Sequence, residues 1–198
     1  MRIRDSQVSK LYRAEREAWQ VYSLPLPTIA DIRKYLEQQS ARKPLQLRYG
    51  DAVNVIEWEL EIADGRGRRH AAAYGSYRIS IPLWARNNWV VLHEWAHIIH
   101  SRLAIDGEIS STTFDLWRHG SRRQELRGGA AHGWQFAAIY LDLVHFCIGK
   151  DAASALKAAF KTHKVRYRPK RTRVATQEQQ ERLAAMRAAR TAPVAKAA

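Results

Sequence analysis

The stretch of sequence that decides the fold runs from residue 87 to residue 103 and reads NNWVVLHEWAHIIHSRL. Apolar residues fill most of its positions, so the pattern predicts a helix that is buried nearly all round. Asn87 or Asn88 is suited to cap its first turn, because an asparagine oxygen accepts a hydrogen bond from a free backbone N–H group there. The strongly polar groups in the middle of this helix are His93, Glu94 and His97, and we expect them to carry chemistry.

The spacing of these three residues is typical of a metal site. Histidines at positions i and i+4 lie one above the other on the same helix face, so His93 and His97 can direct ring nitrogens at one zinc ion (Zn²⁺). Glu94 then lies beside the ion, where it can accept a proton from a zinc-activated water as general base. The alternative is a buried helix whose histidines hydrogen-bond their neighbours. That alternative leaves several buried polar groups in need of a compensating partner.

A catalytic zinc site needs a third protein ligand, and His132 is the strongest candidate in the sequence. It stands directly before a second apolar helix, predicted from about residue 133 to residue 148, and Gly133 permits a sharp entry into that helix. The alternative is a histidine at a helix start with no metal.

The other histidines are weaker candidates for the third ligand. His100 lies about 10.5 Å along the helix axis from the first ligand, too far for one straight helix to close on a single ion. His145 falls within the second apolar helix and is interpreted as a core histidine. His119 belongs to a long irregular connection over residues 104–131. His119 and Tyr140 are candidate oxyanion or substrate contacts.

The segments around the core helix predict an α+β fold. Residues 45–49, 53–60 and 77–81 alternate or are rich in β-forming residues, so they predict a small antiparallel sheet packed on the core helix. Further helices are expected over residues 6–20, from Thr28 to about Ser40, and over residues 151–161. Thr28 and Asp31 have the spacing of a capping box.

The composition bears on compartment and partners. Cys147 is the single cysteine, which fits a reducing compartment, and no apolar leader or run of about 18 residues is present. We therefore expect a cytoplasmic protein that makes no membrane contact. The formal net charge is +14, which favours anionic partners such as DNA or RNA.

The excess positive charge is concentrated near the end of the chain. Residues 161–198 hold eleven Lys or Arg against Glu178 and Glu181, a net charge of +9. The sequence thus predicts a metallohydrolase domain over residues 1–164 and a basic, partly disordered tail over residues 165–198. The tail is either a solvated segment or a nucleic-acid contact, and the candidate residues for that contact are Arg166, Arg168, Lys170, Arg171 and Arg173.

Two motifs resemble those of a known family. Residues 90–100 and the later segment 132–136, HGWQF, look like the HExxH and HGxxF pair of SprT-like zinc metalloproteases. Residues 78–144 are also similar to metallohydrolases of actinobacteria and their phages. The resemblance implies a minimal zincin fold, zinc bound by His93, His97 and His132, and Glu94 as the general base. It also implies proteolysis. The cysteine zinc ribbon that often follows such domains has no counterpart, because the chain has one cysteine.

Three functions are consistent with these features. The first is a metallopeptidase that hydrolyses peptide bonds, with residues 77–81 pairing with an extended protein or peptide substrate. The second is a non-proteolytic zinc hydrolase of a small amide or ester. The third is a nucleic-acid-binding module with a structural zinc, which a fourth protein ligand would indicate.

Overall fold

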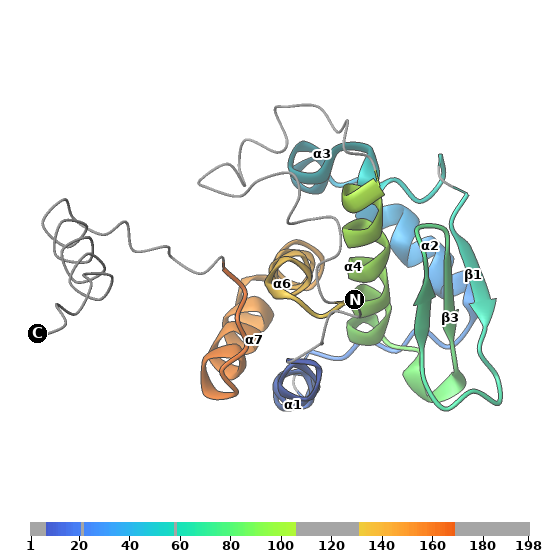
Figure 1. The fold of residues 1–198 in the computed structure, drawn as a ribbon. Coiled ribbons are helices and arrows are strands. Elements are labelled where there is room, and N and C mark those ends of the chain that lie inside the picture. Colours follow the sequence, from blue (N-terminus) through green and yellow to red (C-terminus); the bar gives the residue numbers. More distant parts are fainter. Residues whose placement is uncertain (1–6, 21, 58, 106–130, 169–198) are drawn as a thin grey trace, which may run out of the picture.

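The computed structural model describes residues 7–20, 22–57, 59–105 and 131–168, and within them the fold is mixed α+β (Figure 1). Its α-helices are α1 (Val8–Ala18), α2 (Ile29–Ser40), α3 (Lys43–Tyr49), α4 (Asn88–Ile105), α6 (Trp134–Cys147) and α7 (Lys150–Thr162). Its strands are β1 (Glu61–Asp64), β2 (Ala72–Tyr74) and β3 (Arg78–Ile81). The described residues also form the short 3₁₀ turns η1 (Gly50–Val53) and η2 (Leu83–Ala85).

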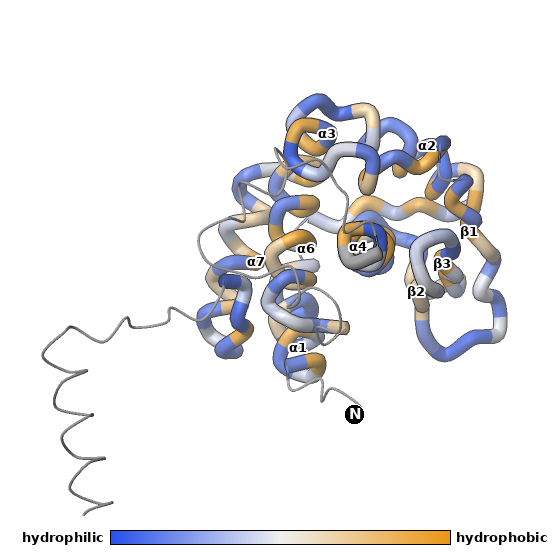
Figure 2. The backbone as a smooth tube through the Cα atoms, turned by 45° about the horizontal axis from the view of Figure 1, so that its top comes forward, coloured by the Kyte–Doolittle hydropathy of each residue, from blue (hydrophilic) through white to orange (hydrophobic). Residues whose placement is uncertain are grey.

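Helix α4 is the centre of the molecule, as its apolar sequence predicts. It lies between α6 on one side and strands β2 and β3 on the other (Figure 2). Trp89 and Trp95 on this helix are fully buried. The predicted cap is confirmed, because the Asn87 side chain accepts a hydrogen bond from the backbone N–H of Val90 at 3.0 Å. Packing on both sides fixes the orientation of α4 in the fold.

The capping box predicted at the start of α2 is also confirmed. The backbone N–H of Asp31 donates to the Thr28 hydroxyl at 3.0 Å, and the backbone N–H of Thr28 donates to the Asp31 carboxylate at 3.0 Å. These bonds satisfy donors that a helix start leaves free. The helix ends at Ser40, where the sequence places its end.

The strand predicted over residues 45–49 is wrong, because this segment is helix α3. Leu45 and Tyr49 are buried, whereas Leu47 is 68% exposed. Buried residues four positions apart share one helix face, so the apparent alternation is a helical period over a short segment. Pro44 lies in the first turn of α3, where a missing backbone N–H costs nothing.

The sheet is mixed rather than antiparallel, which corrects the predicted topology. Its order is β1-β3-β2, with β1 parallel and β2 antiparallel to β3. A tight turn through Gly75, at φ +58°, joins β2 to β3 and makes that pair antiparallel. The strand predicted over residues 53–60 is also misplaced, because the 3₁₀ turn η1 occupies its start and β1 begins at Glu61.

The position of β3 corrects the expected substrate contact. Because β3 is the middle strand, both of its edges pair with neighbouring strands. Residues 77–81 therefore cannot take up an extended substrate by β-pairing. Strands β1 and β2 are the edge strands of this sheet, and β2 packs against α4.

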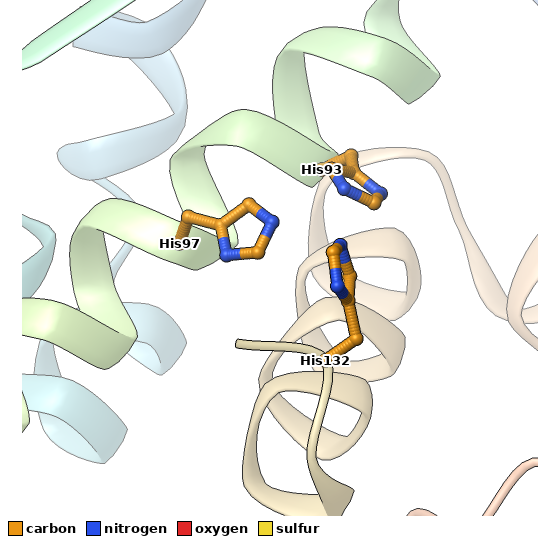
Figure 3. Close-up of side chains that lie close together, drawn as sticks. All are labelled: His93, His97 and His132. Carbon is orange, nitrogen blue, oxygen red and sulfur yellow. The ribbon is translucent and has the colours of Figure 1, made fainter. Parts of the chain in front are cut away.

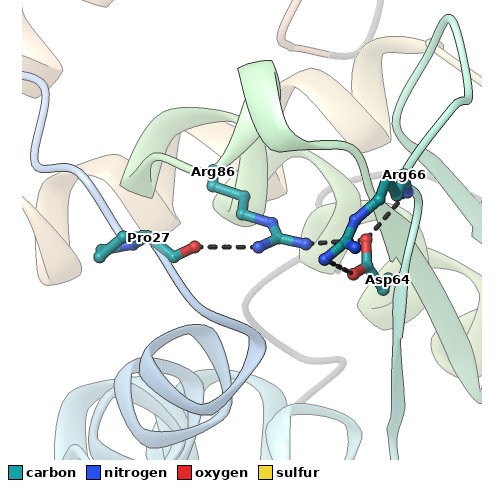
Figure 4. A network of polar contacts seen from close by, with 4 residues as sticks. All are labelled: Pro27, Asp64, Arg66 and Arg86. Atoms are coloured by element: carbon teal, nitrogen blue, oxygen red, sulfur yellow. Dashed lines mark hydrogen bonds and ion pairs between the residues drawn. The ribbon is translucent and has the colours of Figure 1, made fainter.

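Arg86 ties the start of α4 to two other parts of the chain (Figure 4). Its guanidinium donates to the Pro27 carbonyl at 2.9 Å and to the Asp64 carboxylate at 2.8 Å. Asp64 also accepts the backbone N–H of Arg66 at 2.9 Å. This last bond, together with Arg86, lowers the pKa of Asp64. The network joins the end of β1, the entry to α2 and the approach to α4.

The remaining helices close the other side of α4. Helix α6 packs on α4 and on α7, and α7 packs on α1 (Figure 1). The helices predicted over residues 133–148 and 151–161 are thus confirmed with small shifts at their ends. Gly133 has φ −65°, a backbone conformation open to any residue, so the sharp entry does not require a glycine. None of the helices in the described ranges is long and apolar enough to cross a bilayer.

Candidate metal centre

Three histidines converge at the face of α4 that is turned toward α6. His93 and His97 come from successive turns of α4, and His132 comes from the residue before the α6 cap (Figure 3). One ring nitrogen of each lies within 4.8 Å of the others. In the described part of the chain, this is the group of histidines, cysteines and carboxylates close enough to hold one ion. The structure thus brings together the three residues that the sequence singled out.

The donor set fits a zinc ion. Burial, followed by the charges of His93 and His132, lowers the pKa of His97 well below its ordinary value. His97 is therefore neutral at physiological pH and offers a nitrogen lone pair. Three imidazoles that approach from two elements match the His₃ ligand set of catalytic zinc sites, which leaves one tetrahedral position for a reactant.

Glu15 on α1 holds the ring of His93 through its Nδ1 atom. Its Oε1 lies 2.5 Å from Nδ1 of His93, and the Glu15 side chain has no exposed surface. Burial opposes the charged form of His93, but this carboxylate outweighs that effect and raises its pKa. With Nδ1–H donating to Glu15, Nε2 of His93 faces the other two histidines as a lone-pair donor. A carboxylate behind a metal-binding histidine fixes its tautomer and ring orientation.

Glu94 lies on the side of α4 that faces β2. Burial raises the pKa of Glu94, while the charge of His93 and the nearby backbone of Ala73 in β2 oppose the rise. The carboxylate thus lies between the histidine cluster and an edge strand, which is a suitable position for proton transfer near the cluster.

Aromatic rings surround the three histidines. Phe136 stacks on His97, with ring centroids 4.2 Å apart. Tyr12 on α1 stacks on His93 at 5.5 Å and meets the ring of His132 edge-on at 5.6 Å. Tyr12 is 43% exposed, so this ring lies where the cluster meets solvent. These contacts restrict rotation of the imidazoles, which favours a preformed site.

Tyr140, a candidate oxyanion or substrate contact, lies within the interior. Its side chain has no exposed surface, and its hydroxyl accepts a hydrogen bond from Trp19 Nε1 at 3.4 Å. Its ring lies 5.6 Å from the ring of His93. Tyr140 therefore packs on the side of the cluster where Glu15 lies. Burial, and then the charge of Glu15, raises the pKa of Tyr140 well above its ordinary value.

The remaining candidates lie apart from the cluster or outside the described residues. His145 is exposed and packs edge-on against Phe146, so its interpretation as a core histidine is wrong. His100 is buried one turn beyond His97, and no nitrogen of His100 joins the cluster of three. Of the connection predicted over residues 104–131, the first two residues belong to α4, and residues 106–130, which include His119, lie outside the described residues, as do Lys170, Arg171 and Arg173. Arg166 and Arg168 are described, and the Arg168 guanidinium lies over the ring of Tyr167 at 5.5 Å.

Sequence reasoning missed Glu15, although one signal for it exists. Leu11, Glu15 and Ala18 have helical spacing and all three are buried. A glutamate within the apolar stripe of a helix needs a buried partner. The stripe could therefore have identified Glu15 as a polar group of the interior, but nothing local indicates that its partner is His93.

Comparison with known proteins adds no relative: no family model, no curated protein and no solved structure matches the chain. The functional argument therefore rests on the geometry of the site.

Proposed function

We propose that this chain is a zinc-dependent metallopeptidase of the zincin type, with zinc held by His93, His97 and His132. The observation that carries the proposal is the convergence of these three imidazoles, from α4 and from the segment before α6, with Glu94 beside them. The spacing of His93 and His97 and the place of His132 before α6 both favour this convergence, and a bound metal gives it a purpose.

The residues around the cluster have separable roles in this proposal. When bound, zinc polarises the carbonyl of the scissile bond and lowers the pKa of a coordinated water. Glu94 accepts a proton from the attacking water and delivers it to the leaving nitrogen. Glu15 keeps Nδ1 of His93 protonated, so that Nε2 stays available. Phe136 and Tyr12 exclude water from the faces of the histidine rings.

Strand β2 supports a peptide as the substrate. It is an edge strand that packs against α4, and its Ala73 lies near Glu94, so an extended chain laid along β2 passes the proposed general base. Extended peptides bind to exposed strand edges through backbone hydrogen bonds. This role replaces the one expected for residues 77–81. A small amide or ester has no need of such an edge, which is why we favour a peptide over the non-proteolytic alternative.

The test compares hydrolysis by wild type, Glu94→Gln and Glu61→Gln on unfolded, fluorescently labelled casein. Glu61 is an exposed glutamate of β1 and serves as the matched control. We expect Glu94→Gln to lose at least about a hundredfold in rate while it retains zinc, because the proton acceptor is removed and the ligands remain. Glu61→Gln should match wild type. Activity of Glu94→Gln within a few fold of wild type would reject the mechanism.

A second substrate separates the two hydrolase hypotheses. If casein stays intact and p-nitrophenyl acetate is hydrolysed in a reaction that Glu94→Gln abolishes, the chain is a zinc hydrolase of small substrates and the peptidase proposal is wrong. If zinc binds and neither substrate reacts, the metal has a structural role.

A further inference from the structure

Gln7, the residue before α1, links the metal cluster to the C-terminal end of the described chain. Its Nε2 donates to the backbone carbonyl of His132 at 2.6 Å and to the backbone carbonyl of Arg166 at 3.1 Å. Its Oε1 accepts the backbone N–H of Arg166 at 3.1 Å. The side chain is 8% exposed. One buried amide therefore holds two backbone segments that belong to different parts of the sequence.

Residues 165–168 are docked on the fold, and the basic sequence continues from them. Val165 is buried, and its backbone N–H donates to the Phe160 carbonyl at 2.8 Å. The ring of Tyr167 lies 5.8 Å from that of Phe160. The backbone N–H and carbonyl of Arg166 both hydrogen-bond the side-chain amide of Gln7. These contacts fix the root of the basic tail relative to α1 and α7.

Of the three histidines, His132 is the one whose position depends most on contacts with distant parts of the chain. His93 and His97 are set by the backbone of α4, a long buried helix. His132 instead precedes Gly133, the cap residue of α6, and so lies outside the hydrogen-bonded turns of that helix. Its backbone carbonyl is held by Gln7, a residue 125 positions away in the sequence. Displacement of a ligand by a fraction of an ångström weakens a metal site, so this bond bears on metal affinity.

We propose that Gln7 is a positioning residue for His132 and that it couples the metal site to residues 165–168. The inference rests on the proposed zinc site. The docked segment and the bound metal favour the same position of Gln7, so each strengthens the other, as linkage requires. An anionic partner that pulls the basic tail away from α7 therefore weakens zinc binding, and zinc in turn keeps residues 165–168 docked.

The experiment measures the zinc dissociation constant of the full chain by competition with a chromophoric chelator. Gln7→Met removes both sets of hydrogen bonds and nearly conserves side-chain volume. Gln39→Met is the matched control, because Gln39 is also a buried glutamine but lies on α2. We expect zinc affinity to fall about tenfold in Gln7→Met, within the range for groups that support metal ligands. Gln39→Met should bind zinc as tightly as wild type does, because no group that supports a metal ligand is removed.

The coupling itself is tested at Arg166. Arg166→Pro removes the backbone N–H that donates to Gln7, whereas Arg166→Ala removes the side chain and keeps that N–H. We expect Arg166→Pro to weaken zinc binding several-fold and Arg166→Ala to leave it unchanged. The double variant of Gln7→Met with Arg166→Pro should bind zinc no more weakly than Gln7→Met, because both changes break one link.

Each outcome decides a separate point. Wild-type affinity in Gln7→Met overturns the positioning role, and equal affinities of Arg166→Pro and Arg166→Ala overturn the coupling. Thermal melts without metal show whether a variant is folded, and Gln7→Asn, which is too short to span both partners, replaces Gln7→Met if the latter does not fold. A wild-type chain that binds no zinc refutes the proposed function itself, and the inference with it.

Discussion

Removal of the Glu15 carboxylate is the perturbation whose effect on the metal site follows most directly from the structure. Oε1 of Glu15 lies 2.5 Å from Nδ1 of His93, and both side chains are buried. A metal on Nε2 withdraws electron density from the ring and makes the Nδ1 proton a stronger donor. The buried carboxylate stabilises that donor, so Glu15 supports the metal-bound form.

The size of the effect depends on what replaces the carboxylate. Loss of a group behind a metal ligand weakens metal binding by about 10–100-fold, which is about 1.4–2.8 kcal/mol at 1.4 kcal/mol per factor of ten. Glu15→Gln keeps an acceptor oxygen and loses the charge, so we expect a loss of about tenfold. Glu15→Ala leaves Nδ1 buried without its acceptor, so we expect a loss near the upper limit, about a hundredfold.

The assay is zinc competition with a chromophoric chelator at pH 7.5, with Glu17→Gln as the control. Glu17 lies on the same helix, and its Oε2 is 2.8 Å from Nε2 of His163, but this pair is exposed to solvent. A surface pair contributes little, so Glu17→Gln should bind zinc as wild type does. If Glu15→Gln and Glu15→Ala also bind zinc with wild-type affinity, Glu15 does not support the site and the orientation argued for His93 is wrong.

Three further predictions concern parts of the chain away from Glu15. Burial, and then the charge of His132, lowers the pKa of His100 to about 4, below the ordinary value of about 6.5. The unfolded chain therefore binds this proton more readily, and the free energy of unfolding of the metal-free protein falls by up to about 3 kcal/mol between pH 6.5 and pH 4. Urea titrations of His100→Gln should lack this loss. The same pH dependence in His100→Gln as in wild type would contradict the reasoning. Burial raises the pKa of Cys147 to about 12, so iodoacetamide at pH 8 should alkylate the native thiol at least about a hundredfold more slowly than the urea-unfolded thiol, whereas equal rates by mass spectrometry would exclude a protected thiol. The affinity of the full chain for duplex DNA should fall steeply with salt, because each phosphate contact lowers the logarithm of the binding constant by about 0.9 for a tenfold rise in salt concentration. A chain ending at Arg168 should lose this binding. Equal binding by both chains would place the DNA-binding site on the folded part.

The parts of the fold that the sequence predicts correctly are those set by nearby residues. The capping box of Thr28 and Asp31 and the cap at Asn87 involve residues three positions apart. The apolar character of α4 predicts its burial without reference to any partner. His132 was identified because it stands at the start of a second apolar helix, and two buried helices that pack together bring such a residue to the first helix.

The features that the sequence does not predict depend on distant partners. Lys43–Tyr49 is too short for its period to distinguish a helix from a strand, and packing decides between them. The parallel pairing of β1 with β3 depends on which edge of β3 is free, which no local pattern encodes. Glu15 lies 78 positions from His93, and Gln7 lies 125 positions from His132. Nothing in the sequence around Glu15 or Gln7 indicates these partners.

If His93, His97 and His132 hold one zinc ion, the metal content per chain reports it directly. Purified protein is stripped with a chelator, reloaded with zinc, separated from free metal by gel filtration and analysed by mass spectrometry of the metal. Wild type and His145→Ala, a control at an exposed histidine of α6, should each carry one zinc per chain, whereas His97→Ala and His132→Ala should carry essentially none. Wild type without zinc, or His132→Ala with full zinc, would contradict the account.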